Sequence, residues 1–186
     1  MSARCELLAG LPATGPPATP FPSEWGRLAR EGVVVEFSTE SGSWVGNFEP
    51  GLGGLDTALA HPNGKDVVVI ASGDLWVVDP KSREAENLCP TVDGFVEVGS
   101  PEGWIFSRGG LALFRLSAAG VVWHTRRLSW DGIEGLEVRD GFAVGKAYSP
   151  MDDQWHAFSV DVRTGRAEGG SFWLDAPDAW EQLREP

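Results

Sequence analysis

Hydrophobic positions in this chain come in short runs that stop at a glycine or a polar turn and then resume. Four such double runs begin at residues 33, 67, 104 and 142, so the interval between them is about 37 residues. The runs are rich in Val, Ile, Phe and Trp, which favour strands. A regular interval of this size is typical of stacked or circular repeats. The pattern therefore predicts an all-β chain of about four repeat units.

Each of the last three double runs follows another short apolar stretch and a turn. Asn63-Gly64 and Asp140-Gly141 are pairs that favour hairpin turns in which both central residues have a positive φ. Each unit therefore has at least three antiparallel strands, and because propeller blades share this pattern we expect a propeller-like arrangement or an irregular barrel. A fourth strand per unit is offered by three stretches, residues 84–88, 121–129 and 166–174.

The two ends of the chain differ in composition from the repeats. Residues 9–23 hold five prolines and no charge, so residues 1–23 are predicted to be an extended, Pro-rich lead-in and not a packed element. The first repeat has no obvious leading strand of its own. Short terminal helices are predicted over residues 24–32 and 175–186. Residues 24–186 are predicted to form a single β-repeat domain.

Acidic residues dominate the charge. Asp and Glu number 27 against 15 Lys and Arg, which gives a net charge of -12. Such a charge repels phosphate backbones and anionic membranes, so neither nucleic acid nor a membrane is an expected partner. It fits solubility alone or complementarity to a basic protein. Two cysteines, Cys5 and Cys89, are too few for a disulfide scaffold and predict thiols in a cytoplasmic protein.

One group of candidate binding residues lies in the stretch VVWHTRRLSWDGIEGL. Side chains alternate along a strand, so Arg126 and Arg127 are expected to diverge. In a structural interpretation, one arginine pairs with Asp131 or Glu134 and holds a corner in which Trp130 is partly exposed. In a functional interpretation, residues of this corner line a cleft at one end of the sheet.

A second group, in the stretch YSPMDDQWHAF, combines carboxylates with an imidazole. The spacing of Asp152, Asp153 and His156 fits neither a calcium loop nor a zinc site, so a solvated turn is predicted, with no metal and no cofactor. Ser43 and Ser129 lie outside the G-x-S-x-G elbow of hydrolases. The candidate ligand-binding residues are Arg126, Arg127, Trp130, Asp131, Asp153, Trp155 and His156.

Two motifs carry a family resemblance. W-x-T-R-R-x-S-W-D-G begins at Trp123, and W-x-x-F-x-V-D-x-x-T-G-x-x-x-G-G-S begins at Trp155. Together they resemble a pattern shared by small uncharacterised bacterial proteins, and the D-x-x-T-G ending is also similar to β-propeller repeats. The resemblance implies a bacterial origin and transfers no catalytic residue.

We therefore expect a non-catalytic binding module whose acidic surface meets a basic protein partner. An inhibitor of the immunity or antitoxin kind is one specific form of this hypothesis. The alternative is a small-ligand or carbohydrate-binding protein, or a hydrolase, with a cleft near Arg127, Trp130 and Asp131. A deep pocket that joins these side chains would favour the alternative.

Overall fold

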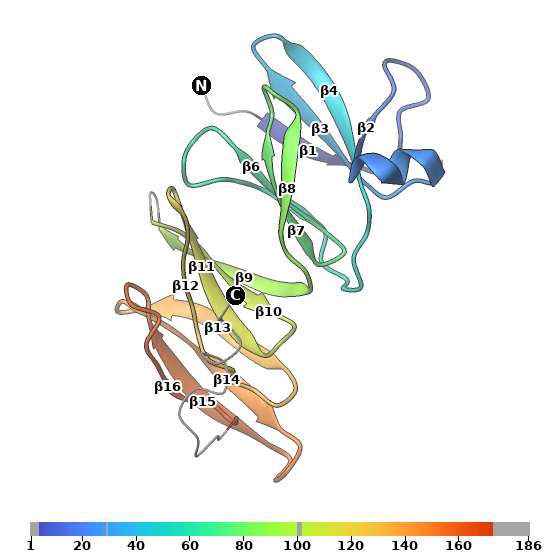
Figure 1. Cartoon of the computed structure of the whole chain (residues 1–186). Helices are drawn as coiled ribbons and strands as arrows, with labels where there is room; N and C mark the ends of the chain where they lie inside the picture. Colours follow the sequence, from blue (N-terminus) through green and yellow to red (C-terminus); the bar gives the residue numbers. More distant parts are fainter. Residues whose placement is uncertain (1–3, 29, 100–101, 173–186) are drawn as a thin grey trace, which may run out of the picture. The chain divides into compact units, whose positions relative to one another are not determined.

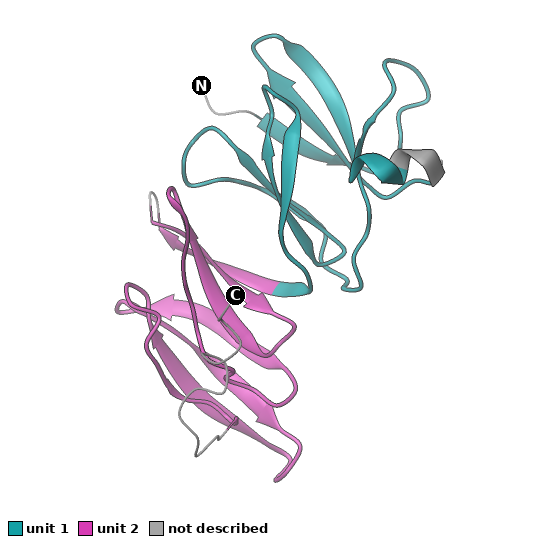
Figure 2. Cartoon of the chain, viewed as in Figure 1, with its two compact units in different colours: residues 1–93 teal, residues 94–186 magenta. Residues whose placement is uncertain are grey.

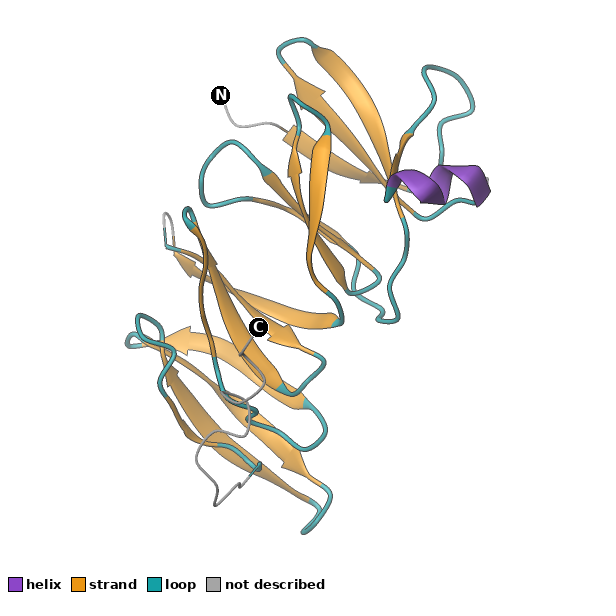
Figure 3. Cartoon of the chain, viewed as in Figure 1, coloured by secondary structure: helices purple, strands orange, loops and turns teal. Residues whose placement is uncertain are grey.

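The computed structural model describes residues 4–28, 30–99 and 102–172 (Figure 1). Strands make up most of this part of the chain, and a single short helix accompanies them (Figure 3). The strands are β1 (Arg4–Leu8), β2 (Thr19–Phe21), β3 (Val33–Thr39), β4 (Gly42–Phe48), β5 (Thr57–Ala60), β6 (Val67–Ala71), β7 (Asp74–Asp79), β8 (Glu84–Cys89), β9 (Val92–Gly99), β10 (Gly103–Arg108), β11 (Ala112–Ser117), β12 (Gly120–His124), β13 (Ile133–Arg139), β14 (Phe142–Ser149), β15 (Gln154–Asp161) and β16 (Ala167–Gly169).

These strands form four sheets of four strands each. Three sheets follow the chain order, β5-β6-β7-β8, β9-β10-β11-β12 and β13-β14-β15-β16. The first sheet has the order β1-β3-β4-β2, in which β2 runs parallel to β4. The predicted all-β class with about four repeat units is confirmed, and the last three repeats have a fourth strand within or overlapping the stretches that the sequence offered, namely β8, β12 and β16.

The chain divides into two compact units, residues 1–93 and 94–186 (Figure 2). Each unit contains two of the four sheets and has its own hydrophobic core. That residues 24–186 behave as a single domain stays a prediction.

The core of unit 1 is rich in aromatic rings. Phe37 and Trp44 face each other across β3 and β4 and stack with their centroids 4.3 Å apart. Phe21 stacks on Phe48 at 4.8 Å. Phe21 and Phe48 also lie 6.5 and 6.0 Å from Trp76 of β7 in the second sheet. Buried rings of this size each contribute about 1.5–3 kcal/mol, so these contacts help to hold the two sheets of this unit together.

The core of unit 2 is largely aliphatic. Its buried members come from the two sheets of the unit and from the connection between β12 and β13. They are Ile105, Leu113, Trp123, Leu128, Ala143, Ala147, Phe158, Val160 and Val162.

The N-terminal segment includes two extended strands, but contrary to the prediction it packs against the first repeat. β1 pairs with β3 from Arg4 to Leu8, and β2 pairs with β4. β1 thus supplies the strand that the first repeat lacks, and Phe21 at the end of β2 is buried in the core of unit 1. The apolar pattern missed β1 because this strand is short and mostly exposed, so few of its positions have to be hydrophobic.

The two turn predictions have different outcomes. Asp140 and Gly141 join β13 to β14 with φ angles of 51° and 82°, as predicted. Gly64 also has a positive φ, of 70°, but it lies in a longer connection between β5 and β6. The side chain of Asn63 accepts the backbone N–H groups of the second and third residues after it, at 2.9 and 3.0 Å, and so organises a wider turn.

The helix predicted over residues 24–32 is a shorter 3-10 helix, η1 (Ser23–Leu28). A stretch this short, with Gly26 in its middle, favours the tighter i to i+3 bonding, and Trp25 N–H donates to Pro22 O at 3.0 Å. The helix predicted over residues 175–186 lies outside the described residues. Within the described ranges, no helix has the length and apolar character needed to cross a membrane.

A bond from a tryptophan to a backbone carbonyl is repeated in the two units. In unit 1, Trp44 on β4 donates its indole N–H to Pro80 O at 2.9 Å. In unit 2, Trp123 on β12 donates its indole N–H to Val162 O, also at 2.9 Å. Both bonds connect the first sheet of a unit to the end of the third strand of its second sheet, so the two units share one internal plan.

The aspartate before each acceptor organises the same turn in both units. Asp79 and Asp161 end β7 and β15, and each accepts the backbone N–H two residues further on, at 2.8 and 2.9 Å. Each turn then has a residue with positive φ, Arg83 or Gly165, whose N–H donates to the carbonyl of the aspartate. The similar endings VVDPKSREAE and SVDVRTGRAE therefore occupy equivalent places.

The two units differ in the hairpin that precedes these aspartates. In unit 1, β6 and β7 close at the pair Ala71–Asp74, around a two-residue turn. Counted back from each aspartate, this pair corresponds to Ala147–His156 in unit 2. There the strands continue through two more pairs and a four-residue turn. Residues 148–155 are thus an addition to the shared plan, and we call them the extension.

Candidate functional site

The candidate residues of the first group lie in the connection between β12 and β13, residues 125–132, which we call the corner. Its centre is fixed to the sheet: Leu128 N–H donates to Leu111 O at 2.7 Å, and the Leu128 side chain is fully buried. Ser129 is also fully buried, and its hydroxyl donates to Gly132 O at 2.6 Å. The corner is therefore a held segment and not a loose loop.

A second buried hydroxyl joins the corner to the end of β14. Ser171 donates to Tyr148 O at 2.6 Å and accepts the backbone N–H of Trp130 at 3.2 Å. Tyr148 N–H in turn donates to Gly132 O at 3.0 Å. Backbone groups and buried hydroxyls thus set the positions of Trp130 and Tyr148, which leaves both rings available for other contacts.

Arg126 and Arg127 lie beyond the end of β12, so strand alternation does not apply to them, and both bond to backbone carbonyls. Arg126 donates to Gly169 O at 2.7 Å. Arg127 donates from Nε to Ser129 O and from a terminal nitrogen to Trp130 O, both at 2.8 Å. A guanidinium has five N–H donors and satisfies several carbonyls that a turn leaves unpaired.

The predicted pairing of one of these arginines with Asp131 or Glu134 is wrong. Glu134 instead lies 3.7 Å from the ammonium of Lys146, and the donors of Arg127 are used by carbonyls of the corner itself. The reason is that the corner leaves backbone carbonyls without a strand partner, and these carbonyls take the arginine donors in place of a carboxylate.

Arg127 also stacks on aromatic rings. Its guanidinium carbon lies 5.5 Å from the ring centroid of Trp130 and 4.5 Å from that of Phe172. The two rings are themselves 4.5 Å apart. Trp130 remains 37% exposed, as predicted. The corner thus already holds one cation against its aromatic surface, a contact worth about 0.5–1 kcal/mol at an exposed site.

The extension carries further aromatic and acidic side chains. Tyr148 and Trp155 pair across β14 and β15, with ring centroids 5.3 Å apart and planes at 53°. The Tyr148 hydroxyl donates to Asp153 Oδ1 at 2.6 Å. Trp155 is 42% exposed, and Met151 at the tip is 80% exposed. The extension therefore presents large apolar side chains to solvent beside carboxylates.

Asp152 and His156 form a pair at the base of the four-residue turn, with Oδ2 and Nε2 2.9 Å apart. The Ser149 hydroxyl, and after it His156, hold the pKa of Asp152 below its ordinary value. Across residues 4–28, 30–99 and 102–172, no group of three or more His, Cys, Asp or Glu side chains is placed to hold a metal ion.

The corner and the extension meet at Gly132. A Cβ atom added to this glycine would lie 3.6 Å from the far edge of the Trp155 ring. Asp131 lies between Trp130 and Gly132, which both bond to the backbone of Tyr148, at 3.3 and 3.0 Å. The hydrogen bond to Asp153 raises the pKa of the Tyr148 hydroxyl, and the charges of Asp153, Asp131 and Asp152 raise it further. The surface formed here, which we call the aromatic-acidic face, consists of Trp130, Asp131, Tyr148, Met151, Asp152, Asp153 and Trp155.

The structure thus brings together most of the residues that the sequence singled out. Arg127 and His156 flank the aromatic-acidic face, whereas Arg126 turns toward the end of the described chain. Sequence reasoning missed Tyr148 and Phe172. Strand alternation offered a signal for Tyr148, because a hairpin that turns at residues 150–153 places it opposite Trp155. Phe172 lies far from the corner in sequence and gave no such signal.

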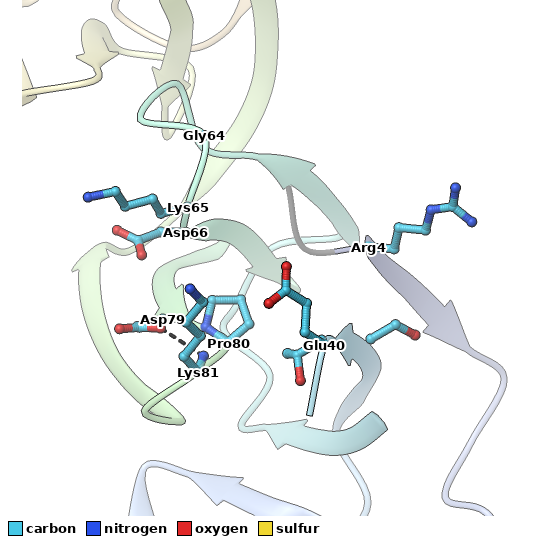
Figure 4. Close-up of a pocket in the computed structure, with 10 residues that line it drawn as sticks. Arg4, Glu40, Gly64, Lys65, Asp66, Asp79, Pro80 and Lys81 are labelled. Atoms are coloured by element: carbon cyan, nitrogen blue, oxygen red, sulfur yellow. Dashed lines mark hydrogen bonds between the residues drawn. The ribbon is translucent and has the colours of Figure 1, made fainter. Parts of the chain in front are cut away.

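A concave site lies elsewhere, in unit 1. It encloses about 500 Å³ and is formed by the ends of β1, β3 and β7 and by the turn after β5 (Figure 4). Arg4 and Lys65 extend away from each other in this view, so their charges do not converge on one point. Its lining residues are Arg4, Ser38, Thr39, Glu40, Gly64, Lys65, Asp66, Asp79, Pro80 and Lys81, which include none of the predicted site residues.

The serines considered as nucleophiles have structural contacts. The hydroxyl of Ser129 is buried and donates to a backbone carbonyl, and that of Ser43 lies 3.3 Å from the hydroxyl of Ser38. No protein-family model and no curated protein matches this sequence. Inference about function therefore rests on the geometry of the aromatic-acidic face.

Proposed function

We propose that this protein is a non-catalytic binding module for a basic protein partner, and that the aromatic-acidic face makes the contact. The observation that carries the proposal is the extension. Unit 1 builds the equivalent hairpin with a two-residue turn, so the fold does not require residues 148–155. Side chains that the fold does not require, and that remain exposed, are candidates for recognition.

The composition of the face supports a protein partner. Trp, Tyr and Met are enriched at protein interfaces, and aromatic residues contribute most to binding when a partner covers them. Trp130, Trp155 and Met151 expose 37, 42 and 80% of their surface. The thioether of Met151 adapts to partners of different shape. Large apolar side chains that remain exposed on the corner and the extension provide contact area for a partner.

The charge of the face supports a basic partner. Asp153 accepts the Tyr148 hydroxyl, Asp152 lies in the same turn, Asp131 lies next to Trp130 in the corner, and the whole chain has a net charge of -12. Opposite charges speed up the encounter of two proteins and select against acidic competitors. An inhibitor of a basic enzyme, of the immunity or antitoxin kind, is the narrower form of this proposal. The thiols of Cys5 and Cys89 support a cytoplasmic setting.

The test is affinity capture from lysate of the native host with two full-length proteins. One is the natural chain, and the other replaces residues 148–155 with Ser-Gly, the turn that unit 1 uses. We expect the natural chain to retain a basic protein at low salt, and less of it at moderate salt, because salt screens exposed charges. The shortened variant should retain none of it. Capture of no protein, or equal capture by both chains, would contradict the proposal.

A further inference from the structure

The exposed rings of the extension differ from Trp130 in one respect. Trp130 and Phe172 already stack against the guanidinium of Arg127. Over Tyr148 and Trp155, in contrast, no cation of the described ranges lies within stacking distance. The corner therefore shows which group such rings hold in this protein, and the extension offers a second pair of rings for the same group.

Carboxylates stand beside this second pair of rings. Asp153 accepts the Tyr148 hydroxyl through Oδ1 at 2.6 Å. Asp131 lies beside Tyr148, because its neighbours Trp130 and Gly132 both bond to the Tyr148 backbone, at 3.3 and 3.0 Å. Within the described part of the chain, neither Asp131 nor Asp153 forms an ion pair, whereas Asp152 is paired with His156. Two negative charges thus border the rings without a cation of their own.

We propose that this part of the face is a seat for one arginine side chain of the partner. The inference rests on the proposed function and names the chemistry of its contact. We call the site the arginine seat, and it consists of Tyr148, Trp155, Asp131 and Asp153.

Arginine fits the seat better than lysine. A guanidinium is flat and weakly hydrated, so it stacks on an indole or phenol ring while its N–H groups still point outward in the ring plane. Those N–H groups then reach the carboxylates of Asp131 and Asp153, which accept two at a time. A lysine ammonium makes a single point contact and holds its water more strongly.

The seat can be tested with a defined probe on the full chain. The probe is an acetylated and amidated Gly-Arg-Gly peptide, and the matched probes carry lysine or the uncharged isostere citrulline in place of arginine. Each of the nine tryptophans gives one indole N–H signal in a nitrogen-proton correlation spectrum, and the Trp155→Phe variant identifies the signal of Trp155.

We expect the arginine peptide to shift the Trp155 signal in a saturable way, with a dissociation constant of about 1–10 mM. Lysine should bind more weakly, and citrulline should cause no shift. Asp131→Asn combined with Asp153→Asn should weaken binding about 3- to 30-fold. Asp140→Asn removes the same charge at the opposite end of β14 and should have no effect. Equal shifts from citrulline, or no shift of the Trp155 signal, would overturn the seat.

The seat and the proposed function fail in distinguishable ways. If a basic partner is captured but binds the Asp131→Asn, Asp153→Asn variant as tightly as the natural chain, the binding module stands and the seat is wrong. If the arginine peptide binds at Trp155 but no basic protein is captured, the seat stands and the proposed function is wrong. A partner that loses affinity for this double variant, and not for Asp140→Asn, supports both.

Discussion

Unit 1 and unit 2 support the same tryptophan with different neighbours. Phe37 pairs across the strands with Trp44, is fully buried, and stacks on the indole. Arg115 has the corresponding place opposite Trp123, is only 8% exposed, and donates to Val162 O at 2.9 Å, the same carbonyl that the indole bonds to. The bond from the tryptophan is therefore the common requirement, and the residue beside it can be an aromatic ring or a guanidinium.

The β6–β7 and β14–β15 hairpins also share a backbone contact but differ in length and in side chains. Both units keep a hairpin that ends in an aspartate and contacts the connection before it, but only unit 2 lengthens it. In unit 1 the carbonyl of Ser72 accepts Gly53 N–H at 2.7 Å, and in unit 2 the carbonyl of Tyr148 accepts Trp130 N–H at 3.3 Å. The backbone contact is thus retained while the side chains change. We therefore assign a structural role to the backbone contact and a role in recognition to the side chains of the extension.

The largest effect is expected from the residue opposite each tryptophan. Phe37→Ala removes a fully buried ring and should lower the free energy of unfolding by about 3–5 kcal/mol. Arg115→Ala removes donors to two backbone carbonyls and should cost less, about 1–3 kcal/mol. Urea unfolding of both variants measures the difference. If Arg115→Ala lowers the free energy of unfolding more than Phe37→Ala does, the hydrogen bonds of the guanidinium support the tryptophan more strongly than the packing of a ring does.

The tryptophan bonds themselves should differ between the units. Trp44→Phe leaves Pro80 O without its side-chain donor and should cost about 1–3 kcal/mol. Trp123→Phe should cost less, because Val162 O keeps the donor from Arg115. Thermal unfolding of the two variants tests this order. In the double variant Arg115→Met, Trp123→Phe, the loss should exceed the sum of the single losses, and strict additivity would refute shared use of the carbonyl.

The shortened hairpin should leave stability nearly unchanged. Replacing residues 148–155 with Ser-Gly removes mostly exposed side chains and keeps a carbonyl for the corner to bond to, so we expect a change within about 1 kcal/mol. Thermal unfolding beside the natural chain is the measurement. If the shortened variant no longer unfolds cooperatively, the extension is required for folding and the two hairpins are not equivalent.

The smallest expected effect is a change in how stability depends on pH, and it concerns Asp79 and Asp161, which end equivalent strands in the two units. Backbone N–H groups, from Lys81 for Asp79 and from Thr164 for Asp161, hold the pKa of each carboxyl below its ordinary value. A lowered pKa in the folded state adds stability above the ordinary value, near pH 4, and that stability is lost as the pH falls through the folded pKa. Between pH 5 and pH 2, Asp161→Asn and Asp79→Asn should therefore lose less stability than the natural chain does. Parallel pH profiles would refute the assigned role.

The fold was predictable from the sequence where strands bury one face and turn with a fixed chemistry. The double runs of apolar residues identified the two middle strands of each sheet, and Asp140-Gly141 identified its turn. β1 and β2 were missed because one is mostly exposed and the other follows prolines. The arginine contacts were missed for another reason. They depend on where β12 ends, and strand alternation does not reveal which carbonyls a corner leaves unpaired.

The candidate site was predictable only in part. Trp130, Asp131, Asp153 and Trp155 came from two separate stretches, and the sequence gave no distance between them. Their approach depends on Gly132, which leaves room for the ring of Trp155, and on buried serine hydroxyls that bond to backbone carbonyls. Such contacts leave little trace in a pattern of hydrophobic and polar positions.

The tryptophan bond has a consequence for how the two halves of this chain can diverge. Its acceptor is a main-chain oxygen, which every amino acid possesses, and the two units indeed present it from Pro80 and from Val162. Substitution at the accepting position is therefore free, and only the donor is restricted to an indole. If the halves descend from one duplicated ancestor, the accepting residue can be substituted freely while the hydrogen bond is kept. Alignments that score side chains will underestimate the kinship of such halves.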